Sequence, residues 1–127
     1  MTPYIKPIQP GEEYFLAEEG CYILELSNSD ADPAVSIARA RVLPGVTTRW
    51  HRLQDTVERY VILSGRGRME LVGLTPQSVG PGDVVLIPPL CPQRIANEGT
   101  DDLVFLAICS PPFHPDCYEA LDDIKMV

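Results

Sequence analysis

Short apolar segments separated by prolines and glycines run through the middle of this 127-residue chain. The thirteen prolines are about twice the average share of roughly 5%, and they stand between the segments. The segments alternate apolar and polar residues or are continuously apolar, as strands are, and no long helical period interrupts them. We expect strands over residues 21–27, 35–43, 57–63, 67–73, 83–87, 92–97 and 103–109. Their spacing predicts a β-sandwich or a small barrel.

Two stretches place polar residues where strands of a barrel would bring them together. They are GVTTRWHRLQDTVERYVILSG, residues 45–65, and GDVVLIPPLCPQRIAN, residues 82–97. Side chains alternate between the two faces of a strand, and one face of every barrel strand points inward. If His51, Glu58 and Gln93 all point inward at one depth, one nitrogen and two oxygens converge. Divalent Zn, Fe, Mn or Ni accepts such a mixture of ligands.

These stretches resemble the paired motifs of the cupin superfamily. The first motif of that family runs Gly, five residues, His, one residue, His, three or four residues, Glu, six residues, Gly. Residues 45–65 reproduce this spacing, with His51 and Glu58 in place. The second motif runs Gly, five residues, Pro, one residue, Gly, two residues, His, three residues, Asn, and residues 82–97 reproduce that spacing. The resemblance covers residues 35–110 and implies an all-β, double-stranded β-helix or jelly-roll fold.

Three positions depart from the family pattern. Leu53 stands in place of the second histidine, Gln93 in place of the third, and Leu90 in place of the turn glycine. Leucine has no ligand atom, and the glutamine carbonyl is a weaker ligand than imidazole for Zn or Fe. The metal set that the resemblance implies is therefore reduced to His51, Glu58 and Gln93. The sequence leaves open whether this is a rebuilt metal centre or a pocket without a metal.

The resemblance indicates an enzyme of small-molecule metabolism, comparable by analogy with sugar-phosphate isomerases. In that hypothesis a divalent metal holds the oxygens of a sugar, sugar acid or related carbonyl compound. Glu58 or Tyr60 then moves a proton as the catalytic residue. Arg41, Gln93 and Ile62 are the candidate ligand-binding residues. Two alternatives remain: a non-catalytic module that binds a small acid or sugar, and a barrel retained for partner contacts.

Simpler interpretations exist for each candidate. His51 is also compatible with a hydrogen-bond donor in the barrel wall, Glu58 with an arginine partner, and Gln93 with a bond to His51 across an empty pocket. Tyr60 is compatible with the core, and Arg41 with the exposed outer face. Three residues are expected outside the pocket: Trp50 in a contact surface, Cys91 packed beside Pro92, and His114 in a loop. The sequence leaves open whether Gln54, Cys91 or His114 contributes to the pocket.

The two ends of the chain differ from its middle. Residues 1–20 are proline-rich and acidic, and they predict an arm or an extra strand. Residues 111–127 predict a tail with a short helix over 117–124, capped by Asp116. We therefore expect a single cupin domain over residues 1–127 with its barrel core at 35–110. An isolated barrel edge favours pairing, so we also predict a homodimer, with the arm as an exchanged strand.

Composition narrows the classes of partner. A net charge of −8 disfavours nucleic acid, and no apolar run approaches the roughly 20 residues of a membrane span. The first residues lack the basic and apolar regions of a secretion signal. The four cysteines show no CxxC spacing and are expected to be reduced, with Cys109 in the core. We therefore expect a cytoplasmic protein whose partners are a small molecule and a second copy.

Overall fold

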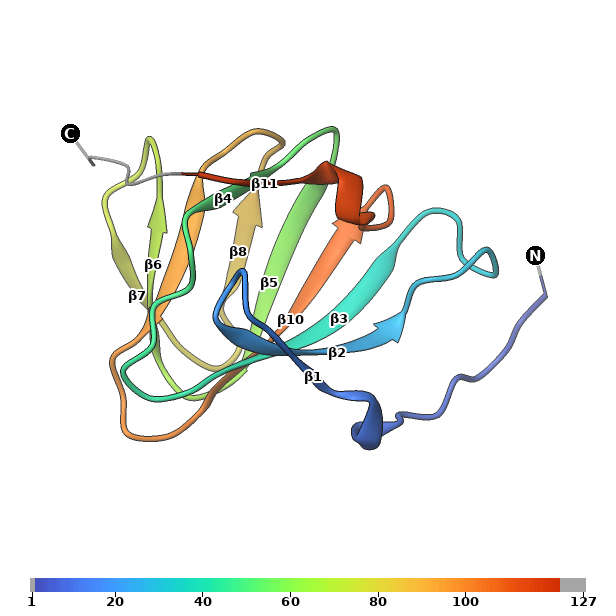
Figure 1. Cartoon of the computed structure of the whole chain (residues 1–127), viewed down its shortest axis with the longest axis horizontal. Helices are drawn as coiled ribbons and strands as arrows, with labels where there is room; N and C mark the ends of the chain where they lie inside the picture. Colours follow the sequence, from blue (N-terminus) through green and yellow to red (C-terminus); the bar gives the residue numbers. More distant parts are fainter. Residues whose placement is uncertain (1, 122–127) are drawn as a thin grey trace.

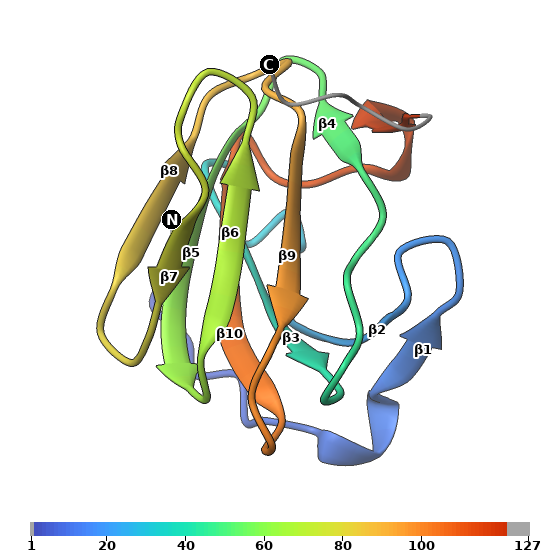
Figure 2. The same ribbon diagram turned by 90° about the vertical axis from the view of Figure 1, so that its left-hand side faces the viewer.

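The computed structural model describes residues 2–121, which form two antiparallel sheets packed face to face as a barrel (Figure 1). The six-stranded sheet has the order β1-β2-β3-β10-β5-β8, and the five-stranded sheet has the order β11-β4-β9-β6-β7. Figure 2 shows the two sheets facing each other. The strands are β1 Tyr14–Leu16, β2 Cys21–Ser27, β3 Ser36–Val42, β4 His51–Leu53, β5 Val57–Ser64, β6 Gly67–Leu71, β7 Gln77–Val79, β8 Val84–Ile87, β9 Gln93–Asn97, β10 Leu103–Ser110 and β11 Tyr118–Ala120. Two short 3-10 helices, η1 Pro10–Glu12 and η2 Pro115–Cys117, lie outside the sheets.

The all-β jelly-roll prediction is confirmed. Each predicted strand is present within one or two residues of its expected ends. Four further strands, β1, β4, β7 and β11, are three residues long, which is too short for alternation to reveal them in the sequence. No helix within residues 2–121 is long and apolar enough to cross a membrane.

The core lies between the sheets, where the inward positions of β3, β5, β6, β9 and β10 meet. Ile62, Ile95 and Leu103 are at most 1% exposed, and burying such a side chain contributes about 1.5–3 kcal/mol. The rings of Tyr60 and Phe105 pack with their centroids 4.2 Å apart. Several inward positions are nevertheless polar and buried: Ser36, Thr48, His51, Thr56, Glu58, Gln93 and Asn97. Buried polar groups need partners, so these positions locate the candidate site.

Two tight turns show how far the motif spacing controls the backbone. Gly65 has φ 81°, and a Cβ there would lie 2.5 Å from the backbone oxygen of Asp102. Leu90 also adopts positive φ, at 65°, at the position where the family pattern has glycine. Its N–H donates to the backbone oxygen of Leu53 at 2.8 Å. A left-handed conformation costs a bulky L-residue about 1–2 kcal/mol, so Leu90 holds a strained turn.

The C-terminal helix prediction is wrong for residues 118–120. This segment is strand β11, which pairs antiparallel with β4 in the register Tyr118–Leu53 and Ala120–His51. Asp116 does not cap a helix there, because its backbone N–H donates to His114 Nδ1 at 3.2 Å in η2. A helix of one or two turns is marginal, whereas the edge of β4 supplies a ready set of backbone partners. Residues 122–127 lie outside the described residues.

The N-terminal residues form an arm followed by a hairpin. Figure 1 shows residues 2–9 running away from the barrel, and Tyr4, Ile5 and Ile8 are 50–91% exposed. Strand β1 then pairs with β2, which confirms the extra strand within residues 1–20. The turn of this hairpin, residues 17–20, lies beside the segment before β4, because Arg49 N–H donates to the backbone oxygen of Glu19 at 3.1 Å.

Candidate functional site

A cavity of about 350 Å³ opens between the β1–β2 hairpin, the inner faces of β3, β5 and β10, and the C-terminal segment. Its volume is at the lower end of the range for small-molecule sites, roughly 300–1,000 Å³. Apolar and aromatic side chains make up most of the wall, including Phe105, Phe113 and Tyr118. The ionisable groups that line it include Glu19, Glu25, Glu58, His51 and His114.

His51 points into this cavity from β4 with one ring nitrogen already committed. Its Nδ1 lies 2.8 Å from the backbone oxygen of Arg49, and because a carbonyl oxygen only accepts, Nδ1 carries the proton. The ring stacks on Tyr118 with centroids 5.0 Å apart. Nε2 therefore faces the cavity, where it lies 3.0 Å from Glu19 Oε1.

Glu19 is a site residue that the sequence analysis missed. It reaches His51 from the hairpin turn, and its side chain is 13% exposed. Burial raises the pKa of Glu19 to about 7, and burial lowers the pKa of His51. Both directions favour the neutral pair, in which the protonated Glu19 carboxyl donates to the bare Nε2 of His51.

Glu58 supplies a second carboxyl group from β5. It is 7% exposed; Oε2 accepts a bond from Cys109 Sγ at 3.7 Å, and Oε1 is buried without a partner. Burial, followed by the negative charge of Glu19, raises the pKa of Glu58 to about 7. Carboxyl groups with such raised pKa values can act as acid or base near neutral pH.

Tyr60 and Gln93 form a buried pair beside these carboxyls. The Tyr60 hydroxyl donates to Gln93 Oε1 at 2.8 Å, and Gln93 Nε2 is buried without a partner. Burial raises the pKa of Tyr60 well above its ordinary value. Tyr60 lines the cavity, but its proton is committed to Gln93 and is hard to remove.

Other predicted site residues lie elsewhere. Arg41, predicted to bind ligand, points to the outer face of β3, because Ala40 and Val42 occupy the inward positions. Its guanidinium pairs with Glu13 at 2.6 Å and Asp102 at 3.2 Å, so the structure does not support that role. Ile62 is buried in the core and is not part of the cavity wall; a ligand-binding role for it is not supported either.

Four further residues complete the placement. Trp50 lies outside the cavity, as expected, with the Arg94 guanidinium 4.7 Å from its ring centroid. Gln54 donates to Glu119 at 3.2 Å, and Cys91 packs against the core without lining the cavity. His114, by contrast, reaches the cavity wall while its side chain stays 71% exposed.

The donor set does not fit the divalent ion that the cupin resemblance implies. His51 Nε2 faces Glu19, Gln93 Oε1 accepts from Tyr60, and Leu53 fills its motif position with an apolar side chain that is 3% exposed. Within residues 2–121, no three His, Cys, Asp or Glu side chains are grouped so that they could hold a metal ion. The groups in this site that can act as acid or base are therefore its own side chains.

Comparison with known proteins agrees with the fold and the motif spacing. Residues 38–109 match the Cupin domain family, and the chain belongs to that family. The uncharacterized protein MJ1618 of Methanocaldococcus jannaschii is 34% identical over 110 residues, which cover 85% of this chain and 87% of that protein.

Two proteins with named activities are also similar. The glucose-6-phosphate isomerase of Pyrococcus furiosus is 40% identical over 65 residues, 46% of this chain and 33% of that enzyme, so the match spans a third of its length. The structure of Pac13, a nucleoside dehydratase from Streptomyces, superposes with a TM-score of 0.74 at 17% identity, covering 98% of this chain and 96% of that one. At that identity, the likeness shows the fold alone.

Proposed function

We propose that this protein is an acid–base enzyme that isomerises a small hydroxy-carbonyl compound of the sugar type without a metal ion. One observation carries the proposal: Glu19 and Glu58 both face one cavity beside His51, and both have pKa values raised to about 7. At neutral pH such a pair presents one carboxylate and one carboxylic acid, which proton transfer in both directions requires.

Glu58 is assigned the role of base. Its buried Oε1 has no partner at hydrogen-bond geometry, although burial raises the pKa of this carboxyl and the Gln93 side chain acts to lower it. This oxygen can accept a proton from the carbon next to a substrate carbonyl. The electron pair of that C–H bond moves toward the carbonyl, and protonated Glu19 gives its proton to the carbonyl oxygen, which yields an enediol. In the second half of the reaction, Glu19 takes the proton of the hydroxyl on the carbon that lost its hydrogen. Glu58 returns its proton to the former carbonyl carbon. The product is the isomeric hydroxy-carbonyl compound, and both carboxyls regain their starting states.

His51 and Tyr60 are positioning residues in this proposal. His51 holds the Glu19 carboxyl through Nε2 at 3.0 Å. Tyr60 was the other candidate for proton transfer, but burial raises its pKa well above its ordinary value, whereas the pKa values of Glu19 and Glu58 are about 7. We therefore assign proton transfer to Glu58 and Glu19, with Tyr60 shaping the wall.

The relatives support a sugar-type substrate. The Pyrococcus furiosus protein is named for isomerising glucose 6-phosphate. Pac13 is named a nucleoside dehydratase, and its structures include uridine complexes. Both named substrates contain a sugar ring or its open-chain form.

Deuterium incorporation tests the proposal directly. The purified protein is incubated in deuterated buffer with a panel of small aldoses, ketoses and their acids, and NMR follows exchange of the C–H next to the carbonyl. We expect catalysed exchange with at least one compound. Glu58→Gln should lower the rate roughly 100-fold or more, and Glu98→Gln, at an exposed loop position away from the cavity, should leave it unchanged.

Three outcomes would contradict this proposal. Unchanged exchange in Glu58→Gln would remove Glu58 as the base. Loss of exchange after chelation, with recovery on adding a divalent metal, would restore the metal-dependent hypothesis. Ligand binding without exchange would favour the non-catalytic binding module.

We also propose that the protein works as a homodimer, supported by the outer face of the six-stranded sheet. Val84 and Leu86 of the edge strand β8 are 64% and 60% exposed. Val61 of β5 is the strand partner of Val84 and extends this apolar face. Leu86→Lys should convert dimers to monomers in light scattering coupled to size exclusion. Leu74→Lys, on an equally exposed loop leucine, should not. A wild-type monomer at micromolar concentration would contradict the dimer.

A further inference from the structure

The charged groups around the cavity are unbalanced. Three glutamates, Glu19, Glu25 and Glu58, line it, and no lysine or arginine of residues 2–121 is among its lining residues. Among the described residues, the exposed lining residue His114 accepts from Asp116 N–H at its Nδ1, 3.2 Å away. An anionic ligand would therefore meet acidic side chains without a compensating guanidinium or ammonium, the groups that proteins use for phosphate and carboxylate.

Three arginines on strands that border the cavity are engaged elsewhere. Arg39 and Arg41 pair with Glu13 beneath the β2–β3 face. Arg52 binds Glu119 through two nitrogens at 2.8 and 3.1 Å. Moving any of these arginines into the cavity would break an ion pair and reverse the face on which its strand presents it. For these three arginines, exclusion from the cavity wall follows from strand parity.

The wall that remains suits an uncharged hydroxylated ring. Tyr60, Phe105 and Tyr118 offer flat apolar surfaces, on which the C–H face of a sugar or a base can lie. Glu58 lines the cavity, and its Oε1, which has no partner at hydrogen-bond geometry, is an acceptor for a ligand hydroxyl. The Ser36 hydroxyl, which also lines the cavity, accepts from Phe113 N–H at 2.8 Å.

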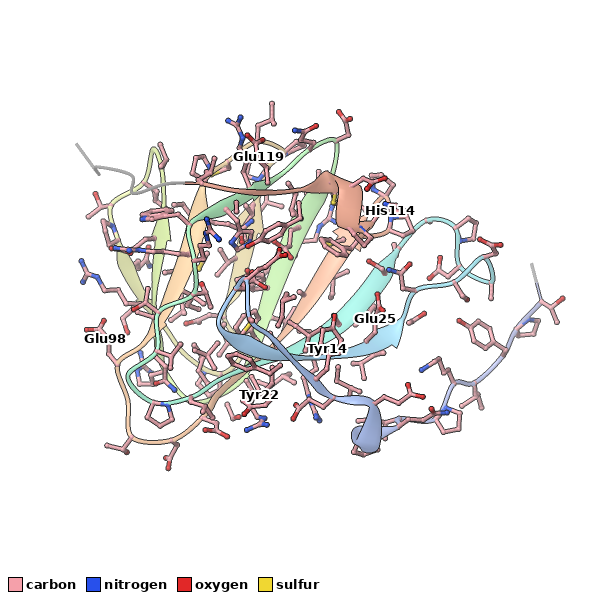
Figure 3. All side chains as sticks on the ribbon, in the orientation of Figure 1. Tyr14, Tyr22, Glu25, Glu98, His114 and Glu119 are labelled. Atoms are coloured by element: carbon pink, nitrogen blue, oxygen red, sulfur yellow. The ribbon has the colours of Figure 1, made fainter. Side chains whose placement is uncertain are left out.

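We infer that the cavity binds uncharged hydroxylated ring compounds, such as free sugars or nucleosides, and rejects their phosphates and acids. The inference rests on the proposed function for the use of this cavity, and it narrows the substrate to the uncharged members of the class. Figure 3 shows Glu25 beside Tyr14 on the hairpin side of the barrel, well away from Glu98. Glu25 lines the cavity and accepts from Asn28 Nδ2 at 2.8 Å, so it is a carboxylate that can be inverted while Glu19 and Glu58 are kept.

Matched pairs of ligands test the selectivity. Uncharged pentoses, hexoses and nucleosides are each compared with their phosphate and, where one exists, their acid, by thermal shift and then by calorimetry. We expect at least one uncharged member to bind at least tenfold more tightly than its anionic counterpart. Tighter binding of a phosphate or an acid, or no binding by any uncharged member, would overturn the inference.

A charge inversion sharpens the test. Glu25→Lys should strengthen binding of the anionic member of the best pair at least tenfold and change the uncharged member less than threefold. Glu98→Lys makes the same change in net charge far from the cavity and should alter neither. Equal effects from both variants would show that only overall charge matters, and would overturn the inference.

The two proposals fail separately. Selective binding of an uncharged compound without deuterium exchange leaves the selectivity intact and contradicts the catalysis. Exchange catalysed on a phosphorylated sugar keeps the acid–base chemistry and contradicts the selectivity.

Discussion

The two motif stretches have the same regularity of spacing, but they do different work. In residues 45–65 the side chains that the pattern specifies, His51 and Glu58, reach the cavity. In residues 82–97 the specified Asn97 fastens the backbone instead: Nδ2 donates to Val42 and Asp101 oxygens at 2.9 and 2.8 Å, and Oδ1 accepts from Gly99 at 2.9 Å. Motif spacing thus positions strands and turns, while the chemistry depends on a few side chains that can change separately.

The largest expected effect comes from removing the fastening residue of the second stretch. Asn97 is 2% exposed, so Asn97→Ala leaves two carbonyl oxygens and one N–H without their partner. The bond to Val42 is buried, whereas those to Asp101 and Gly99 are partly buried. An unsatisfied buried group costs about 1–3 kcal/mol, so we expect the free energy of unfolding to fall by about 3 kcal/mol. Urea denaturation measures it, with the exposed neighbour Glu98→Ala as control. A loss below 1 kcal/mol would show that the second stretch does not depend on Asn97.

The first stretch should make stability depend on pH. The pKa values of Glu19 and Glu58 are raised to about 7 in the folded state, so both groups contribute stability that is present below their unfolded pKa near 4.5 and is lost as the pH rises toward 7. Each contributes at most about 3 kcal/mol. His51 has a lowered pKa and acts in the opposite sense, because stability is lost as the pH falls below its unfolded value near 6.5.

Because His51 acts in the opposite sense, we expect the free energy of unfolding to fall between pH 5 and pH 8 by less than the two carboxyls would give alone. Glu58→Gln should flatten this profile. Urea titrations at several pH values measure both proteins. A wild-type profile that is flat or rises over this range would contradict the raised pKa values.

Placing histidines at the family's ligand positions tests whether the two stretches together can bind a metal ion. Leu53 and Gln93 occupy histidine positions of the family pattern, and Gln93 is paired with His51 across β4 and β9. The double variant Leu53→His, Gln93→His should bind Ni²⁺ or Zn²⁺ through three histidines and Glu58. At a metal concentration 100 times the Kd, the stabilisation is about 2.7 kcal/mol. The two single variants are the controls, and equal stabilisation of the wild type would contradict the conclusion that its donor set does not fit a divalent ion.

The smallest effect concerns the strained turn. Leu90 has φ 65° and is 52% exposed, so Leu90→Gly relieves the left-handed strain with little loss of packing. After the greater flexibility of unfolded glycine is included, we expect the protein to become more stable by about 0.5–1 kcal/mol. Thermal unfolding measures it, with Leu90→Ala as control because alanine keeps the Cβ. Destabilisation by glycine would mean that the Leu90 side chain contributes more than its strain removes.

Much of the fold and part of the site could be predicted from sequence. Alternation along residues 57–63 and the motif spacing placed Glu58 and Tyr60 on one inward face, and the structure agrees. The side of the sheet on which Arg41 lies was harder to predict. The sequence of β3 alternates alanine, arginine and valine, and only the pairing of β10 with β3 and β5 decides which side faces inward.

Glu19 could not be found from motifs, since it lies before residue 38, where the family match begins. A weak signal existed, because Glu19 has the same parity as Cys21 and Ile23 of β2, which line the cavity. Its contact with His51 depends on how the hairpin folds back against the segment before β4, which is tertiary information. The strand at 118–120 was missed for the same reason, because its partner β4 is distant in the chain.

The hairpin turn that carries Glu19 docks through the backbone, with its carbonyl oxygen accepting from Arg49 N–H. This contact does not involve the side chain at position 19, so a substitution of similar size there keeps the backbone bond that docks the turn. The barrel fixes the orientation of the His51 imidazole, and the residue at position 19 of the hairpin turn is the group that contacts it. Substituting one loop position would thus re-tune acidity, ligand preference or metal affinity while every strand stays where it is.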